Sequence, residues 1–185
     1  MHVLGIAGSL RKASFNRALL RAAQELAPEE MEITVFDLAP IPLYNEDVEK
    51  QGDPGPVAAL KDAIRAADAL LFASPEYNYG VPGVLKNAID WASRPPGKSP
   101  LNGKAAAIMG ASPGAGGTRS MQLALRQAFV FTETYAMLKP EIYVASARDK
   151  FDAEGRLTDA KTREFVGKLL AALVPWAEKF PRPSA

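Results

Sequence analysis

The sequence predicts an α/β protein, a three-layer sandwich with a parallel sheet between two layers of helices. Five short, mostly apolar segments alternate with five longer segments whose apolar residues recur at the helical period. Most of the short segments are apolar throughout, which is typical of strands covered on both faces. Right-handed crossovers between the strands then narrow the possible topologies.

The first strand and helix give the clearest pattern. Residues 2–7 are apolar and partly β-branched, and Gly8 ends the run, as expected of a strand buried on both faces. The next segment places apolar residues on one continuous helical face from Phe15 to Leu26.

The other elements follow in the same alternation. Strands are predicted at residues 31–37, 69–73, 104–110 and 140–145, and helices at 57–67, 83–93, 118–131 and 158–180. We expect the last helix to bend near Pro175. Residues 38–56 are rich in proline and are predicted to form a long surface loop. Tyr44 and Asn45 could border a pocket there, but ordinary packing is the expected role of Tyr44. The length fits one domain, residues 1–180, with a loose tail at 181–185.

The turn after the first strand carries groups that suit an anion. It joins the carboxyl end of a strand to the unpaired N–H groups of a helix N-terminus. Ser9, Ser14 and Asn16 add hydroxyl and amide donors, and Arg11 adds a guanidinium that can hold two phosphate oxygens. Taken singly, Ser14 could merely cap the helix and Arg11 could be a solvated charge. Together the four residues favour a phosphate site.

Absent motifs narrow the kind of phosphate. Neither GxxxxGK[ST] nor GxGxxG occurs, so the turn is neither a P-loop nor a dinucleotide pyrophosphate loop. Hydroxyls with one arginine better fit a terminal monophosphate, such as that of flavin mononucleotide (FMN).

Composition excludes several kinds of chemistry. Because 22 basic residues balance 21 acidic ones, no overall field attracts the chain to nucleic acid or an anionic membrane. The lack of cysteine excludes disulfides, a thiol nucleophile, iron–sulfur clusters and Cys-based zinc sites. His2, the only histidine, lies at the wrong end of its strand for a metal site or triad at the phosphate turn. With no signal peptide or membrane span evident, we expect a cytoplasmic protein that binds no metal.

Two more segments follow predicted strands and are unusual for plain connections. Residues 74–80 combine a proline, an asparagine and two tyrosines, and residues 111–117 contain three glycines that let a flat ligand approach the backbone. Carboxyl ends of parallel strands are where α/β sheets bind ligands. The helix at 83–93 carries more apolar surface than one sheet face readily covers, so either subunit association or packing within the monomer must bury it.

Three stretches together resemble the NADPH-dependent FMN reductase family, flavodoxin-like proteins that include bacterial quinone, azo-dye and chromate reductases. They are GSLRKASFN at 8–16, PEYNYGVPGVLKNAIDW at 75–91 and SPGAGGTR at 112–119. The first two motifs are specific, the third would be weak alone, and the resemblance spans residues 3–144. It implies a flavodoxin-like fold with a five-stranded parallel sheet of order 2-1-3-4-5 and FMN at the switch point between strands one and three.

By this resemblance, the first motif binds the FMN phosphate, the second lies along the isoalloxazine edge and the third lines the other side of the flavin. The residues implied at the cofactor are Ser9, Arg11, Ser14, Phe15, Asn16, Pro75, Glu76, Tyr77, Asn78, Tyr79, Ser112, Gly114 and Gly117. Two alternatives stay open: Glu76 could be a surface carboxylate near a helix N-terminus, and the tyrosines could pack at a subunit contact.

The implied activity is a ping-pong cycle. NADPH or NADH passes a hydride to N5 of FMN and leaves, and a quinone, azo compound, chromate or free flavin then accepts the electrons. No catalytic side chain is expected, because the cofactor carries the chemistry. Basic residues on the first helix favour NADPH slightly, and the family likeness implies a homodimer or homotetramer. The alternative is a flavodoxin-type electron carrier, which binds FMN without accepting hydride; such carriers tend to be strongly acidic, unlike this chain.

Overall fold

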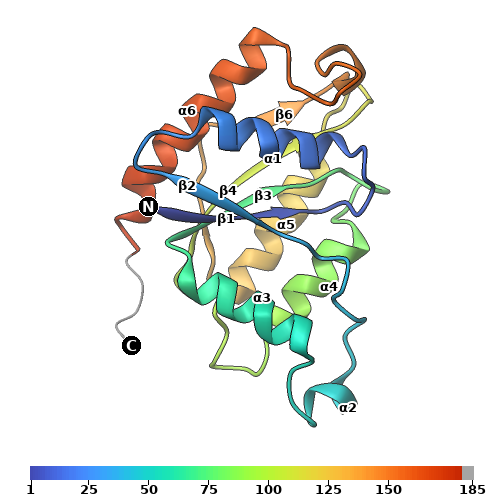
Figure 1. The fold of residues 1–185 in the computed structure, drawn as a ribbon. Coiled ribbons are helices and arrows are strands. Elements are labelled where there is room, and N and C mark those ends of the chain that lie inside the picture. Colours follow the sequence, from blue (N-terminus) through green and yellow to red (C-terminus); the bar gives the residue numbers. More distant parts are fainter. Residues whose placement is uncertain (181–185) are drawn as a thin grey trace.

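The computed structural model describes residues 1–180 and shows one parallel sheet between two layers of helices (Figure 1). The strand order is β2-β1-β3-β4-β5, with β6 also paired to β4, which confirms the predicted flavodoxin-like order. The strands are β1 (His2–Ala7), β2 (Glu32–Phe36), β3 (Ala69–Ala73), β4 (Ala105–Ala111), β5 (Tyr135–Ala136) and β6 (Ile142–Val144). The predicted loose tail, residues 181–185, lies outside the described residues.

Helices cover both faces of the sheet. The helices α1 (Phe15–Leu26) and α6 (Ala160–Ala177) lie on one face, and α3 (Gly55–Ala66), α4 (Gly83–Ala92) and α5 (Arg119–Thr132) lie on the other (Figure 1). Successive strand residues feed opposite cores: Leu71 packs under α1 and α6, while its neighbour Leu70 packs under α3 and α4. This two-sided burial explains the unbroken apolar runs in the sequence. No helix among residues 1–180 is long and apolar enough to cross a membrane.

The outer edge of the sheet differs from the prediction. One strand was expected at residues 140–145, but two short strands share this position: β5 pairs with the first residues of β4 and β6 with its last. Pro140, between them, has no N–H to donate to a ladder, which favours an interruption there. At two residues, β5 is too short to give a periodic pattern, so the sequence did not reveal it.

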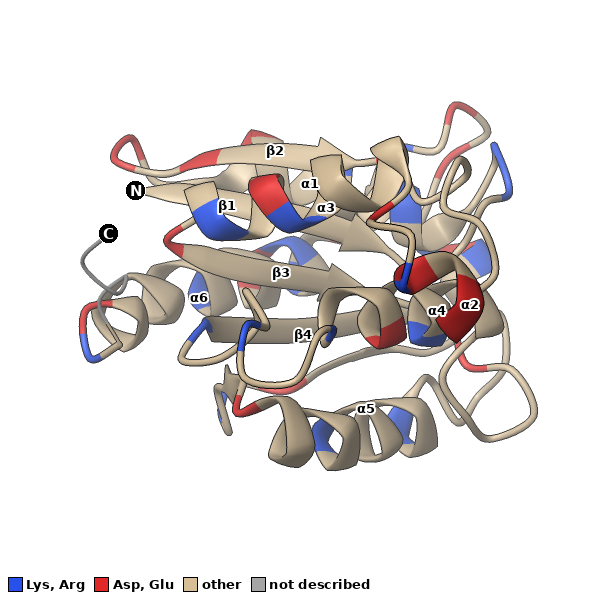
Figure 2. Ribbon diagram, turned by 90° about the horizontal axis from the view of Figure 1, so that it is seen from below, with Lys and Arg blue, Asp and Glu red and all other residues tan. Residues whose placement is uncertain are grey.

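The proline-rich segment 38–56 covers α4 and contains one short helix, α2 (Glu46–Glu49), which the sequence analysis missed. Figure 2 shows the acidic residues of α2 in red, in front of α4. The carbonyl of Pro42 accepts hydrogen bonds from Trp91 Nε1 at 2.9 Å and Asn87 Nδ2 at 2.8 Å. The ring of Tyr44 meets Trp91 edge to face, with centroids 5.1 Å apart, so Tyr44 packs as expected.

This packing answers the question raised by the apolar surface of α4. Trp91 and Leu85 are fully buried within the chain, and Ala88 and Ile89 nearly so. Packing within the monomer therefore accounts for the helix, and no subunit contact is needed to bury it.

Candidate functional site

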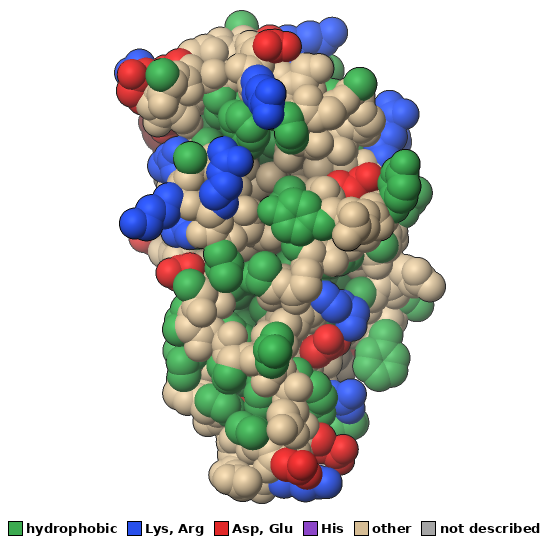
Figure 3. Space-filling view, turned by 90° about the vertical axis from the view of Figure 1, so that its right-hand side faces the viewer, with side chains coloured by type: hydrophobic (Ala, Val, Ile, Leu, Met, Phe, Trp, Pro, Cys, Tyr) green, Lys and Arg blue, Asp and Glu red, His purple; other side chains and the backbone are tan. Residues whose placement is uncertain are grey.

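The three motif segments lie side by side at one edge of the sheet. They follow β1, β3 and β4, which are neighbours, and the Gly8 N–H donates to the Ala73 carbonyl at 2.9 Å. Close packing joins them further, because a Cβ on Gly8 would collide with the Ser74 side chain and a Cβ on Gly110 with Thr118. Figure 3 looks onto this edge, where Lys and Arg side chains stand beside exposed hydrophobic ones. The sequence did not reveal that Ser74 and Thr118 are the buried spacers between the segments.

The phosphate turn is closed by its own hydrogen bonds. Ser14 is the N-cap of α1, and its Oγ accepts from the Asn16 N–H at 3.2 Å. The Oγ of Ser9 accepts from the Arg11 N–H at 3.4 Å. Both serines are buried, and the first turn of α1 contains no acidic residue. The positive end of the helix dipole therefore faces this turn without a competing carboxylate from its own first turn.

Arg11 is exposed and curls over the same turn. Its Nη2 donates to the Ala13 carbonyl at 2.8 Å, and its Cζ lies 6.0 Å from the centre of the Phe15 ring. Phe15 in turn contacts Phe151, with ring centroids 5.3 Å apart. The guanidinium thus stays at the mouth of the turn, with most of its donors unused by the bond to Ala13.

Asn16 has a structural role that the sequence did not suggest. Its side chain is 2 % exposed; its Oδ1 accepts from the Ala111 N–H at 2.8 Å and its Nδ2 donates to the Ala111 carbonyl at 2.9 Å. This pair of bonds fastens the start of α1 to the end of β4, 95 residues away in the sequence. Asn16 therefore sets the distance between the first and third motifs.

The second motif forms a tight turn with two tyrosines at its tip. Tyr77 and Gly80 exchange backbone hydrogen bonds, and between them Asn78 and Tyr79 have φ angles of 50° and 61°. Two central residues with positive φ are the mark of a type I′ turn, and a tyrosine is an unusual residue there. Such strain is held where surrounding structure requires it. The Tyr79 ring is 82 % exposed and that of Tyr77 52 %, so both are available to a ligand or a partner.

Glu76 reaches from this motif to α5. Its Oε2 accepts from the Met121 N–H at 3.0 Å, in the first turn of a helix whose own N-cap, Thr118, makes no side-chain cap bond. Glu76 therefore supplies the cap from another segment, which is the alternative role considered for it. Pro75, next to it, is half-buried.

The third motif is a turn tied to β6, in which Gly114 and Gly116 are exposed and Gly117 is buried. Ser112 donates its N–H to the Val144 carbonyl at 2.9 Å, and its Oγ accepts from the Gly114 N–H at 3.2 Å. Gly117 has a φ of 66°, and a Cβ there would press on Tyr143. Both the backbone conformation and the lack of space therefore require glycine at this position. A Cβ on Gly116 would meet nothing within 4 Å, so bare backbone borders open space.

These features fit FMN. A helix N-terminus with buried hydroxyls and a guanidinium suits a monophosphate, and a glycine turn opposite an exposed aromatic turn suits a flat ring. Within residues 1–180, no group of three or more His, Asp or Glu side chains is placed to hold a metal ion.

Comparisons with known proteins agree with this geometry. Residues 1–149 match the family model of NADPH-dependent FMN reductases. The chain is 54 % identical to an NAD(P)H-dependent FMN reductase of Pseudomonas aeruginosa, over 96 % of this chain and 95 % of the relative. It is 43 % identical to a quinone reductase of Pseudomonas putida, over 94 % of this chain and 92 % of the relative.

One solved structure in particular shares the fold and much of the sequence. It is the flavoenzyme NAD(P)H:(acceptor) oxidoreductase of Paracoccus denitrificans, which superposes with a TM-score of 0.89 at 39 % identity, covering 97 % of this chain and 98 % of that one. The arrangement of the three motifs and the match across most of the chain lead to one conclusion: this protein belongs to the NADPH-dependent FMN reductase family.

Proposed function

We propose that residues 1–180 form one FMN-binding domain that oxidises NADPH or NADH and reduces a quinone. The observation that carries this proposal is the meeting of the phosphate turn, the tyrosine turn and the glycine turn at one sheet edge. Relatives named as FMN and quinone reductases support it. Azo compounds, chromate and free flavin are further acceptors that an open site would admit. Because NAD(P)H is the reductant, we propose the cytoplasm as its compartment.

The residues of the site bind and orient. We assign the phosphate to Ser9, Arg11 and the N-terminus of α1, the edge of the ring system to the turn at Tyr77–Gly80, and one face of it to the glycine turn. When bound, FMN supplies the redox chemistry, taking a hydride at N5 and giving two electrons to the acceptor. Asn16 and Glu76 hold the three segments in register through Ala111 and Met121.

We further propose that the protein assembles as a homodimer or homotetramer through α5. Leu123, Val130 and Phe131 on this helix and Leu138 after it are all more than 60 % exposed. Arg126 and Glu133 lie seven residues apart beside this apolar surface, where a groove of about 400 Å³ also opens. Two copies packed antiparallel would set Arg126 against Glu133 of the partner subunit, so the surface is complementary to itself.

The visible spectrum of the purified protein tests the proposed function. Under anaerobic conditions, flavin absorbance should bleach when NADPH is added and return when a quinone is added. Bound flavin that stays oxidised with both NADPH and NADH would instead indicate an electron carrier. Failure to bind flavin after addition of FMN would overturn the assignment of the phosphate turn.

A further inference from the structure

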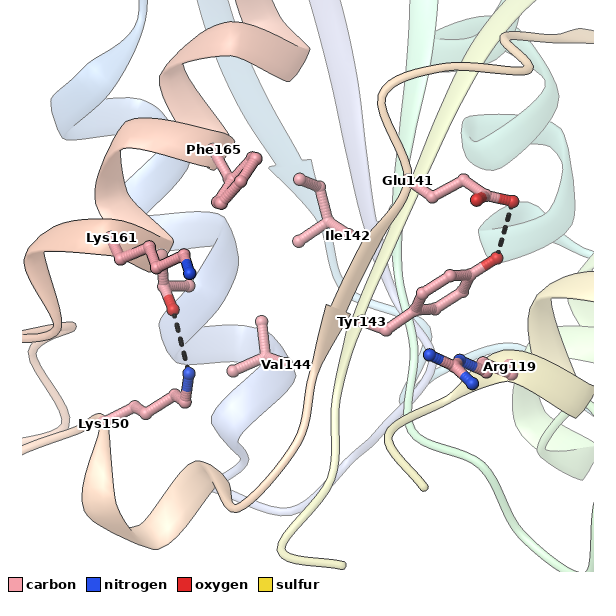
Figure 4. A pocket seen from close by; sticks show the side chains of 9 residues that line it. Arg119, Glu141, Ile142, Tyr143, Val144, Lys150, Lys161 and Phe165 are labelled. Atoms are coloured by element: carbon pink, nitrogen blue, oxygen red, sulfur yellow. Dashed lines mark hydrogen bonds between the residues drawn. The ribbon is translucent and has the colours of Figure 1, made fainter. Parts of the chain in front are cut away.

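A second cavity opens at the outer edge of the sheet, beside the glycine turn. It has a volume of about 300 Å³ and lies where β6, the first turn of α6, the start of α5 and Lys150 come together. Because β6 runs parallel to β4, its carboxyl end points to the same edge of the sheet as the candidate site. Figure 4 shows Ile142 and Val144 pointing from β6 toward Phe165 and two lysines.

The cavity combines an apolar floor with basic groups from three separate elements. Ile142, Val144 and Phe165 form the floor, and Arg119, Lys150 and Lys161 supply the charge. The Nζ of Lys150 forms an ion pair with Asp159 Oδ2 at 3.6 Å and donates to Thr162 Oγ1 at 3.4 Å. Within residues 1–180, neither Arg119 nor Lys161 forms an ion pair.

The one acidic residue that lines the cavity is already engaged. Glu141 accepts from Lys139 Nζ at 2.6 Å and from the Tyr143 hydroxyl at 2.8 Å, and Figure 4 shows it, with Tyr143 and Arg119, on the far side of β6 from the lysines. The bond from Lys139 and the bond from Tyr143 hold the pKa of Glu141 below its usual value, so it stays ionised against those partners. Three basic residues and one acidic residue line the cavity, so the net charge of its lining is positive, which suits an anion with an apolar part.

The cavity shares a wall with the turn assigned to the flavin. Tyr143 packs against Gly117, and Arg119 follows that glycine by two residues, its guanidinium 5.5 Å from the centre of the Tyr143 ring. A co-substrate whose reactive end reaches the flavin can extend over this wall. On α1, Arg17 lies 3.9 Å from Asp37, and Arg21 donates to the Gly155 carbonyl at 3.3 Å. Lys150 is paired with Asp159 in the same way, so Arg119 and Lys161 are the cations of the cavity that form no ion pair within residues 1–180.

We propose that this cavity binds the adenosine end of NADPH, with Lys161 holding the 2′-phosphate and Arg119 the pyrophosphate. The inference rests on the proposed function and names the residues that select between the two nicotinamide nucleotides. The adenine ring packs on the floor formed by Ile142, Val144 and Phe165. NADH lacks the 2′-phosphate and leaves Lys161 without a ligand, so the enzyme prefers NADPH.

Binding of adenosine 2′,5′-bisphosphate and of 5′-AMP to the FMN-loaded protein, measured by calorimetry, tests the site without turnover. We expect the wild type to bind adenosine 2′,5′-bisphosphate more tightly than 5′-AMP. Lys161→Met, at an exposed position, weakens bisphosphate binding about five- to tenfold and leaves 5′-AMP unchanged. The matched control is Lys98→Met. Lys98 is an exposed lysine in the α4–β4 connection, at the opposite edge of the sheet, and its substitution should change the dissociation constant of neither nucleotide.

Steady-state kinetics with a quinone give the second reading. Lys161→Met raises the KM for NADPH by a similar factor while kcat and the KM for NADH stay unchanged, whereas Arg119→Ala raises the KM for both nucleotides. Equal bisphosphate affinity in wild type and Lys161→Met overturns the proposal, as does an equal loss for both nucleotides. A protein that oxidises NADH yet shows no preference for the bisphosphate disproves only this inference; one that oxidises neither nucleotide disproves the proposed function.

Discussion

Two polar side chains around the candidate site, buried Asn16 and half-buried Glu76, bind backbone groups of distant segments. Asn16 satisfies both polar groups of Ala111, and Glu76 satisfies the N–H of Met121. Neither contact is local in sequence, so no motif spacing reveals it. The exposed residues show the opposite pattern: Arg11 has most of its donors free for a ligand. Substitutions at the buried positions should therefore lower the stability of the fold, and substitutions at the exposed positions should weaken ligand binding.

Arg11→Ala should weaken FMN retention and leave the fold intact. The side chain is exposed and bonds only to the Ala13 carbonyl within its own turn, so its loss removes a charge-assisted contact to the phosphate. We expect FMN affinity to fall about tenfold or more, measured by fluorescence titration of the apoprotein. Arg11→Lys, which keeps the charge without the planar fork, should recover part of it. Stoichiometric flavin in the purified alanine variant would contradict the assignment.

Asn16→Ala should instead destabilise the whole protein. It leaves the buried N–H and carbonyl of Ala111 without the amide partner, which costs about 2–3 kcal/mol of the free energy of unfolding. Urea denaturation of the apoprotein measures this loss. Ser14→Ala is a useful comparison, because it removes a helix cap from the same turn and should cost only about 1 kcal/mol. Equal stability of Asn16→Ala and wild type would show that the brace contributes nothing.

At the scale of elements, the structure links helix ends to the site. The cap of α5 comes from the second motif through Glu76, and the glycine turn immediately before α5 belongs to the third. The position of α5 and the ordering of its first turn therefore depend on the contact between Glu76 and Met121. The cap of α6, by contrast, is local: Asp159, its N-cap residue, accepts from the Thr162 N–H beside the basic cavity.

Glu76→Ala should loosen the N-terminus of α5. Loss of the carboxylate leaves the Met121 N–H uncapped and removes a negative charge from the positive end of the helix dipole, at a cost of about 1 kcal/mol in unfolding free energy. Glu76→Gln keeps an acceptor oxygen and should recover most of the stability. Hydrogen exchange at Met121 reports the change directly: it should speed up in the alanine variant and stay near the wild-type rate in the glutamine variant.

Asp159 should make α6 sensitive to acid. Hydrogen bonds from the Thr162 hydroxyl, at 2.5 Å, and from its N–H, at 2.8 Å, hold the pKa of Asp159 below its ordinary value. Because the folded state binds the proton less readily, the contribution to stability is present above the unfolded pKa and is lost as pH falls through the folded one. Asp159→Asn should cost about 0.5 kcal/mol at pH 7 and nothing once the aspartate is protonated. Urea unfolding of both proteins across this range checks the sign.

The elements that the sequence predicted well are those whose pattern is wholly local. Both β1 and β3 have the bounds expected from unbroken apolar runs, residues 2–7 and 69–73, and α1 matches its apolar face. Elements fixed by distant partners were missed: β5 exists because two residues pair with β4, and α2 lies in a segment held on α4 by Asn87 and Trp91. The same holds for the site. Its three segments could be predicted from motifs. The basic cavity could not, because its cations come from residues 119, 150 and 161, which are far apart in the sequence.

For the whole molecule, the distribution of exposed apolar side chains is uneven. The helix α4, which drew attention by its apolar sequence, is covered by residues 38–56 of the same chain, while α5 presents Val130 and Phe131 almost fully to solvent. A contiguous exposed apolar surface of this kind marks an interaction site. The neighbouring Arg126 and Glu133 make a second copy of the chain the fitting partner.

Phe131→Glu should therefore dissociate the proposed assembly. A carboxylate on the apolar surface of α5 would have to be buried against the partner subunit, which costs several kcal/mol. Light scattering coupled to size-exclusion chromatography should report a dimer or tetramer for the wild type and a monomer for the variant, with unfolding of the isolated subunit little changed. Leu43→Glu, at an equally exposed position in the 38–56 segment, should leave the assembly intact. A monomeric wild type, or a Phe131→Glu variant with the mass of the wild-type assembly, would exclude α5 as the subunit contact.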